Sequence, residues 1–249
     1  MTKKNVYRPS KNIYAKSKAV QEYRMKEARK KSLKYFYNSI PENLRGYDVE
    51  ELAAHGSDYE NLTTAGKASL RRYIEDPTLF LLLSGASGVG KSSVACAIAL
   101  ALLRRGFGMT AKYADVSTML NEFSFGDAEG THRMQHLSSL KNYDILILDD
   151  VGAGSNLSTP TRQNAMQSLI SYRWEHDKIT IMTTNLAISR SSEKENGEDS
   201  IQGWFGESAW DRIAGRASTG DTNLTRVNFI GSTLRGNSSR GAMRGGFGR

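Results

Sequence analysis

The chain has 249 residues, of which 39% are hydrophobic and 24% are charged, and its formal net charge is +8 at pH 7. This length suits one sizeable α/β domain with a smaller appendage. No apolar stretch approaches the roughly 20 residues of a membrane span, and no apolar core follows the basic N-terminus as it would in a signal peptide. Cys96 is the only cysteine, so the chain cannot form an intrachain disulfide, and no Cys/His cluster suggests zinc. We expect Cys96 to be a small core residue, and this cysteine usage fits a reducing cytoplasm.

The positive charge is concentrated at the two ends of the chain. Residues 1–75 carry 16 Lys and Arg against 9 Asp and Glu, a net charge of +7. Residues 76–235 carry 15 against 17, a net charge of −2, and residues 236–249 carry three Arg and no acid. We therefore expect a basic N-terminal region, a nearly neutral central domain and a basic tail, and we expect the ends to contact acidic partners.

The N-terminal 75 residues have the pattern of a small helical module. Residues 15–40 contain no Pro or Gly and predict a basic helix after a loose start. Pro41 is suited to the first turn of a further helix. Apolar residues around Val49–Ala53 and from Leu62 to Ile74 predict two short helices, separated near His55-Gly56-Ser57.

From Thr78 onward, short apolar runs alternate with helical stripes, which is typical of a parallel sheet covered by helices. The expected strands are 79–84, 109–113, 144–149, 179–184 and 225–230. The expected helices are 91–105, 116–124, 132–142, 160–176 and 206–217. Residues 191–200 are polar and predicted to be mobile, and the Arg/Gly-rich tail from Gly236 is predicted to be disordered.

The segment Gly85–Ser92 reads G-x-x-x-x-G-K-S, a complete phosphate-binding loop. It lies between the apolar run 79–83 and an apolar helical segment, which is the context in which glycine amides and a helix N-terminus bind phosphate. In this motif Lys91 reaches the β- and γ-phosphates and the Ser92 hydroxyl binds Mg²⁺. We expect ATP to be held by Gly85, Ser87, Gly88, Val89, Gly90, Lys91, Ser92 and Ser93.

A second motif, Tyr143–Asp150, ends an apolar strand in two acids. In a doubly wound sheet, these acids would lie beside the phosphate loop. We assign Asp149 to support of Mg²⁺ and Asp150 to orientation or polarisation of the attacking water.

Two further motifs supply polar groups to the same chemistry. Asn185 ends the apolar strand 179–184 and could hold the water or sense the γ-phosphate, or it could be a turn residue that ends the strand. An arginine from a neighbouring subunit can neutralise charge on the γ-phosphate. Arg212 in Asp211-Arg212-Ile213 is the candidate, and Arg216 is its competitor.

The order of phosphate loop, Leu-Asp-Asp, Thr-Thr-Asn, Asp-Arg-Ile and Val-Asn-Phe…Leu-Arg resembles the AAA+ helicase loaders of the DnaC/DnaI kind and the related IstB-type transposition ATPases. The resemblance covers residues 78–236. It implies a P-loop AAA+ ATPase domain over 76–235, with Arg212 as the arginine finger and Arg235 as a second sensor of nucleotide. The family more often has Asp-Glu where this chain has Asp149-Asp150, a difference that bears on hydrolysis more than on ATP binding.

The same resemblance implies particular partners. The N-terminal region 1–75 would grip a hexameric replicative helicase of the DnaB type. The ATPase domain would assemble with further copies in the presence of ATP and contact single-stranded DNA, without any membrane. The size and basic ends would suit a phage or plasmid replication protein working in the host cytoplasm.

Other interpretations of the sequence remain open. An IstB-like regulator would bind duplex DNA and stimulate a transposase. The loop Ser87–Ser92 is also found in small-molecule kinases, and a nucleotide-gated adaptor would bind ATP with little turnover. The basic ends, including Lys3, Lys4 and the tail with Phe247, could bind single strands, or they could dock acidic proteins and aid solubility.

Overall fold

The computed structural model shows the parallel α/β architecture that the sequence predicts. Its described residues form a five-stranded sheet in the order β2-β3-β4-β1-β5, in which neighbouring strands are parallel. The strands are β1 (Phe80–Ser84), β2 (Ala111–Asp115), β3 (Ile145–Val151), β4 (Ile179–Thr184) and β5 (Leu224–Asn228). The structure describes residues 11–45, 61–106, 108–124, 131–153, 160–188, 200–215 and 222–231.

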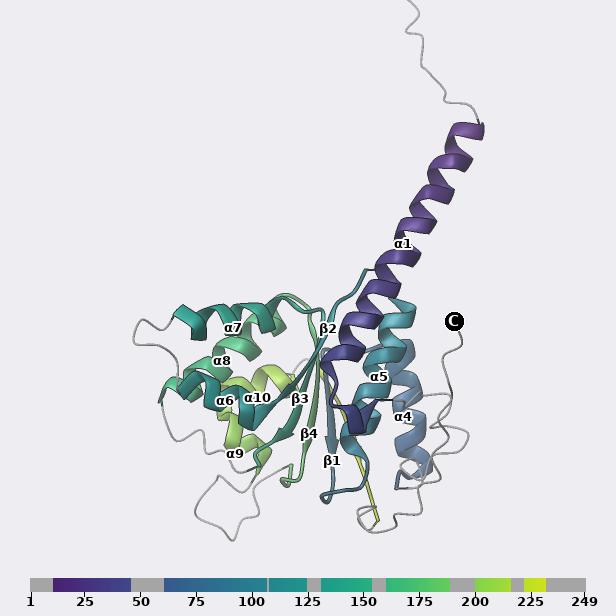
Figure 1. Ribbon diagram of the computed structural model, residues 1–249. Helices are drawn as coiled ribbons and strands as arrows, with labels where there is room; N and C mark the ends of the chain where they lie inside the picture. The colour runs from purple at the N-terminus through teal and green to yellow at the C-terminus, as the bar shows by residue number, and fades with distance from the viewer. Residues whose placement is uncertain are drawn as a thin grey trace, which may run out of the picture.

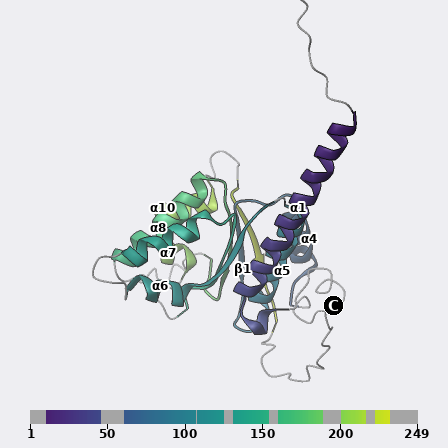
Figure 2. The ribbon, with the colours of Figure 1, turned by 45° about the horizontal axis from the view of Figure 1, so that its top comes forward.

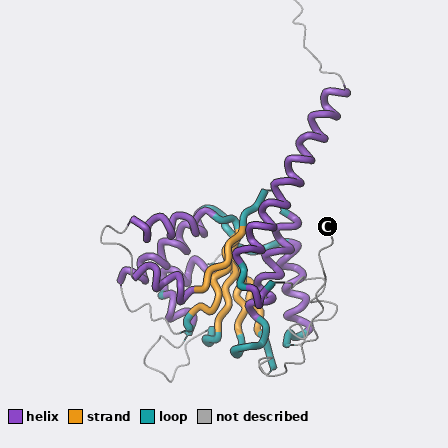
Figure 3. The backbone as a smooth tube through the Cα atoms, in the orientation of Figure 1, coloured by secondary structure: helices purple, strands orange, loops and turns teal. Residues whose placement is uncertain are grey.

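Helices cover both faces of the sheet, as Figures 1 and 3 show. One face carries α1 (Lys11–Ser39), α4 (Thr64–Glu75) and α5 (Lys91–Arg105). The other carries α6 (Val116–Ser124), α7 (Thr131–Asn142), α8 (Pro160–Glu175), α9 (Ile201–Phe205) and α10 (Glu207–Ala214). Successive strand side chains point to opposite faces. Leu81 and Leu83 therefore join the core under α5, while Leu82 joins the core on the opposite face.

Strand β2 lies two residues later than the expected strand 109–113, and the structure departs from the expected elements in two further places. Strand β3 continues through both acids to Val151 instead of ending at Asp149, with a register irregularity against β4 between Leu148 and Val151. The helix expected over 206–217 is present as α10, and the short helix α9, which the sequence did not predict, precedes it across Gly206 with φ 76°. Cys96 is fully buried in α5, as expected.

The N-terminal helix α1 extends away from the body of the protein in both ribbon views (Figures 1 and 2). Its C-terminal end is anchored, because Phe36 joins the apolar core that also contains α5. Ile40, which follows the helix, joins the same core. Nine Lys and Arg against two Glu make α1 strongly basic, and the described side chains before Leu33 are exposed or half-buried. None of the described helices is both long and apolar enough to cross a membrane.

The rest of the N-terminal region is short. Pro41 precedes the three-ten helix η1 (Glu42–Leu44). Thr63 caps α4, because its hydroxyl accepts a hydrogen bond from the Gly66 amide at 3.0 Å. The helix expected near Val49–Ala53 lies outside the described residues. Leu70 and Tyr73 of α4 are buried in the same core as Phe36.

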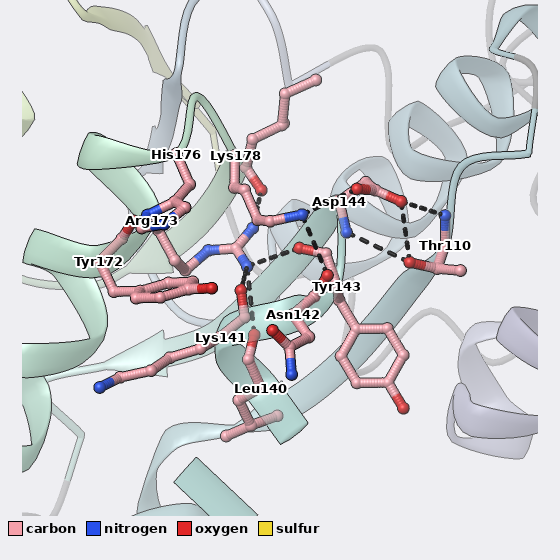
Figure 4. A network of polar contacts seen from close by, with 11 residues as sticks. Thr110, Leu140, Lys141, Asn142, Tyr143, Asp144, Tyr172, Arg173, His176 and Lys178 are labelled. Atoms are coloured by element: carbon pink, nitrogen blue, oxygen red, sulfur yellow. Dashed lines mark hydrogen bonds and ion pairs between the residues drawn. The ribbon is translucent and has the colours of Figure 1, made fainter. Parts of the chain in front are cut away.

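A fully buried arginine fixes the amino ends of the two central strands (Figure 4). Arg173, on α8, donates to the carbonyl of Tyr143 at 2.7 Å, to the carbonyl of Ile179 and to the hydroxyl of Thr180 at 2.9 Å. It also donates to the carbonyl of Leu140 at 3.1 Å near the end of α7. Burial lowers the pKa of Arg173 to about 9, so its guanidinium still carries its charge at neutral pH.

A second polar group lies beside this arginine (Figure 4). Asp144 accepts from Lys178 Nζ at 2.9 Å and from the amide and hydroxyl of Thr110 at 2.8 and 2.9 Å. Partial burial opposes ionisation of Asp144, but the hydrogen bonds from Lys178 and Thr110 outweigh it and lower the pKa. The starts of β3 and β4 are thus tied to α7, α8 and the segment before β2.

Replacing Arg173 with Ala should destabilise the fold by about 3–5 kcal/mol, because several buried carbonyls would lose their donor. Arg71→Ala, at an exposed position on α4, serves as the matched control and should stay within about 0.5 kcal/mol of the parent. Urea unfolding followed by circular dichroism measures both. Equal urea midpoints for Arg173→Ala and Arg71→Ala would contradict the stabilising role of Arg173.

Candidate functional site

The phosphate loop joins the end of β1 to the start of α5 in a conformation that requires glycine. Gly85 has φ 145°, and a Cβ there would lie 2.8 Å from the carbonyl oxygen of Phe229. Gly88 and Gly90 have φ 79° and 97°. Such backbone is accessible to glycine and strained for other residues. The loop therefore brings the N-terminus of α5, the positive end of the helix dipole, to the carboxyl edge of the sheet.

Neighbouring segments hold this loop on both sides. The Gly85 amide donates to the Thr184 carbonyl on β4 at 3.3 Å, and the Phe229 amide donates to the Ser84 carbonyl at 2.7 Å. Asn61, which lies before α4, donates from Nδ2 to the Val89 carbonyl at 3.2 Å. The N-terminal region thus contacts the phosphate loop directly.

Lys91 is buried in the first turn of α5, with 7% of its surface exposed. Its ammonium donates to the carbonyls of Gly85 at 2.9 Å and Ala86 at 2.7 Å, and to Asn185 Oδ1 at 2.7 Å. These oxygens surround the cation inside the curve of the loop. The arrangement holds the ammonium group beside the α5 N-terminus, where an anion would be favoured.

The two acids lie at the irregular end of β3. Asp150 has φ 58°, a left-handed conformation that Asp tolerates better than most residues. Its amide donates to the Thr183 hydroxyl at 2.8 Å, and its Oδ1 accepts from Asn185 Nδ2 at 3.2 Å. A bulge of this kind re-aims side chains at a strand end. It brings Asp150 to the asparagine that also contacts Lys91.

Asp149 is 7% exposed, and both of its carboxylate oxygens accept hydrogen bonds. The Thr183 hydroxyl on β4 donates to Oδ1 at 2.6 Å, and the Tyr113 hydroxyl on β2 donates to Oδ2 at 2.6 Å. Burial raises the pKa of Tyr113 above its usual range, and the neighbouring Asp149 charge raises it further. Tyr113 therefore remains a protonated donor at any physiological pH.

Together these contacts form one hydrogen-bonded chain that links three neighbouring strands, β2, β3 and β4, to the start of α5. It runs from Tyr113 through Asp149, Thr183 and the backbone of Asp150 to Asn185 and Lys91. The expected site residues Lys91, Asp149, Asp150 and Asn185 are thus brought together. Ser92, half-buried, and Ser93, buried, follow Lys91 in the first turn of α5, and Ser87 is exposed on the loop.

The expected arginines lie elsewhere. Arg212, on α10, donates to the carbonyl and hydroxyl of Ser208 at 2.8 and 2.7 Å, and its guanidinium lies 5.9 Å from the centre of the Trp174 ring. Its carbonyl accepts from Asn223, directly before β5, so it lies at the amino edge of the sheet, away from the phosphate loop of its own chain. Arg216 and Arg235 lie outside the described residues.

Three residues that contact the site or its loop were assigned no role by the sequence analysis. Thr183 lies within the Thr-Thr-Asn motif, Tyr113 is the middle residue of β2, and Asn61 precedes α4. Each contributes through strand register or loop packing, which no local pattern reveals. The only available signal was the proximity of Thr183 to Asn185 in sequence.

The donor set suits a magnesium ion that is held mainly by phosphates. Asp149 and Ser92 offer the carboxylate and hydroxyl oxygens that Mg²⁺ prefers. The described residues contain no cluster of three or more His, Cys, Asp or Glu that could hold a metal by itself. Because Mg²⁺ in nucleotide sites typically uses one or two protein oxygens together with substrate phosphates and water, this sparse set fits.

The parallel sheet, the glycine loop before α5 and the acids at the end of β3 define a P-loop nucleotide-binding protein of the AAA+ type. The sequence matches the family described as IstB-like ATP binding protein over residues 21–199. The chain belongs to this family, as the motif resemblance implied. No curated protein sequence matches it.

Three solved structures illustrate the shared fold. The DnaC helicase loader has a TM-score of 0.55 and 21% identity, covering 75% of this chain and 99% of that one. DnaI has a TM-score of 0.55 and 18% identity, covering 77% and 95%. The replication initiator DnaA bound to AMPPCP and single-stranded DNA has a TM-score of 0.51 and 14% identity, covering 73% and 49%. At these identities, the likeness establishes the fold.

Proposed function

We propose that this protein is an ATPase that loads a hexameric replicative helicase onto single-stranded DNA. The observation that carries the ATPase part is the hydrogen-bonded chain from Lys91 to Asp149, which places a cation and two acids around one phosphate-binding loop. The loader part is supported by the likeness of the fold to a structure described as the DnaC helicase loader, over 99% of that chain.

In this proposal, the glycine loop and the α5 N-terminus bind the triphosphate. The ammonium of Lys91 would exchange the carbonyls of Gly85 and Ala86 for β- and γ-phosphate oxygens. If the ammonium also leaves Asn185 Oδ1, that oxygen would be able to accept a hydrogen bond from the attacking water. Nucleotide binding and the orientation of Asn185 are thereby coupled.

The two acids would have different roles, one in Mg²⁺ binding and one in activation of water. Ser92 and Asp149 would hold Mg²⁺, which neutralises phosphate charge when bound. Asp150 would orient the attacking water and accept its proton. The hydrogen bond from Asn185 Nδ2 to Asp150 Oδ1 at 3.2 Å is suited to keep that carboxylate turned toward the loop.

Assembly would complete the site with an arginine from a neighbouring copy. Since Arg212 lies at the amino edge of its own sheet, we propose that it serves the triphosphate of an adjacent subunit. Arg216 remains the competitor, and Arg235 would act as a second sensor of nucleotide.

The N-terminal region would be the part that grips the helicase. The basic helix α1 extends from the ATPase core, and its anchored end shares the core of α5, the helix that begins with Lys91 (Figures 1 and 2). Its excess of Lys and Arg would suit acidic protein surfaces or the DNA backbone. In this proposal, residues 1–75, 76–235 and 236–249 act as partner-binding region, ATPase domain and basic tail.

Lys91→Ala should weaken ATP binding by roughly 10–100-fold, because it removes a charge-assisted contact to phosphate. Asp150→Asn should spare binding and slow hydrolysis by roughly 100-fold or more. Fluorescent-nucleotide titration and phosphate release measure the two effects. Lys30→Ala, exposed on α1, is the control that should change neither. Wild-type turnover in Asp150→Asn would contradict the role of Asp150.

Arg212→Ala should reduce hydrolysis by roughly 1,000-fold while nucleotide binding is retained. Mixing this variant with Lys91→Ala should restore part of the activity, because one interface in the mixed assembly then contains both intact groups. Phosphate release from mixtures of fixed total concentration measures the recovery. Recovery with Arg216→Ala and not with Arg212→Ala would assign the finger to Arg216.

Unwinding by the replicative helicase of the same source, on template coated with single-strand-binding protein, should require this protein and ATP. The helicase alone should show little unwinding, and Lys91→Ala should not support it. A real-time unwinding assay with a fluorescently labelled fork measures the dependence. Unwinding that is independent of a folded, ATP-binding preparation would remove the loader proposal.

The family match favours a second candidate, an ATPase that regulates a DNA transposase, since the matched family is named for IstB. This function predicts a preference for duplex over single-stranded DNA at physiological salt, whereas the loader predicts the reverse. Fluorescence anisotropy with both DNA forms at the same ionic strength distinguishes them.

A further inference from the structure

The Asp149 carboxylate is held from both sides by hydroxyl groups that belong to the two strands flanking β3. Tyr113 on β2 pairs in register with Ile147, two residues before Asp149, so the tyrosine side chain reaches diagonally along the same face. Thr183 on β4 reaches the other oxygen beside the β3 irregularity. Both O–H···O distances are 2.6 Å, in the range of charge-assisted hydrogen bonds.

Two such bonds on different oxygens prevent the carboxylate from rotating. A carboxylate has about four acceptor positions, so accepting two hydrogen bonds leaves lone pairs on both oxygens for a metal ion or its water. The pair Tyr113 and Thr183, which we call the carboxylate clamp, thus fixes orientation without exhausting the capacity of Asp149 to bind. Because Asp149 is 7% exposed, water competes little for these positions.

The clamp also connects the two acids. The Thr183 hydroxyl that donates to Asp149 accepts the amide hydrogen of Asp150, whose φ of 58° is strained for a non-glycine residue. One hydroxyl therefore fixes the side chain of the first acid and the backbone of the second. Packing alone does not account for Tyr113, because its ring contacts the core and phenylalanine would serve that purpose equally well.

We infer that Tyr113 and Thr183 are positioning residues that hold Asp149 in the orientation needed for Mg²⁺-dependent nucleotide binding. This inference rests on the proposed function, in which Asp149 supports the metal ion. Hydrogen-bonding partners of metal-binding carboxylates typically change metal affinity by 10–100-fold when removed. Tyr113 supplies the donor that no sequence motif of this chain identifies.

The test is the Mg²⁺ dependence of binding of a fluorescent non-hydrolysable ATP analogue to the full chain. Tyr113→Phe should raise the Mg²⁺ concentration at half-saturation by about tenfold, and should leave analogue binding in EDTA unchanged. Tyr35→Phe is the matched control. The Tyr35 hydroxyl lies 3.2 Å from the Tyr143 hydroxyl, and this pair is far from the site. Tyr35→Phe should change neither quantity. Asp149→Asn should abolish the Mg²⁺ dependence.

The outcomes separate the inference from the function on which it rests. Wild-type Mg²⁺ dependence in Tyr113→Phe, with loss in Asp149→Asn, overturns the clamp and retains the metal role of Asp149. Wild-type Mg²⁺ dependence in both Tyr113→Phe and Asp149→Asn overturns the metal role of Asp149 as well. If Tyr113→Phe weakens analogue binding equally with Mg²⁺ and in EDTA, the variant has a packing defect, and the clamp is overturned.

A second pair of variants keeps the inference testable if Tyr113→Phe fails to fold. Thr183→Ser retains the hydroxyl and should keep the wild-type Mg²⁺ dependence. Thr183→Val keeps the shape, removes the hydroxyl and should lose affinity for Mg²⁺ by about tenfold or more. Similar behaviour of the Ser and Val variants overturns the inference.

Discussion

The parallel pairing of β3 with β4, and of β4 with β1, is the constraint on which the site depends. Because parallel strands end at the same edge of a sheet, groups from distant parts of the chain meet there. The glycine loop follows β1, the two acids end β3, and Asn185 follows β4. In this arrangement Lys91 contacts Asn185 at 2.7 Å while Asn185 contacts Asp150.

Strands β3 and β4 have a buried positive charge beside their amino ends and a buried negative charge at their carboxyl ends. At the amino edge, the buried guanidinium of Arg173 is satisfied by carbonyls and a hydroxyl (Figure 4). At the carboxyl edge, the buried carboxylate of Asp149 is satisfied by two hydroxyls. Burying a charge is unfavourable unless it is hydrogen-bonded, so each network favours one register. The amino-edge network thereby holds the amino ends of the two strands whose carboxyl ends carry the site.

The nucleotide site and the N-terminal region are physically continuous. Phe36 from α1 and Leu70 from α4 lie in the same core as α5, and Asn61 contacts the phosphate loop at Val89. The helix that begins with Lys91 and the N-terminal helices α1 and α4 therefore share one core.

The sequence by itself determined the fold class, the order of elements and the positions of Lys91, Asp149, Asp150 and Asn185, because each belongs to a local pattern of strand, turn or helix. The extension of β3 through the acids, the additional helix α9 and the contacts of Tyr113, Thr183 and Arg173 were decided only by the tertiary structure. These depend on which strands become neighbours and in what register. The physical reason is that a hydrogen bond between strands is set by alignment in space, whereas a turn or helix start is set by residues adjacent in sequence.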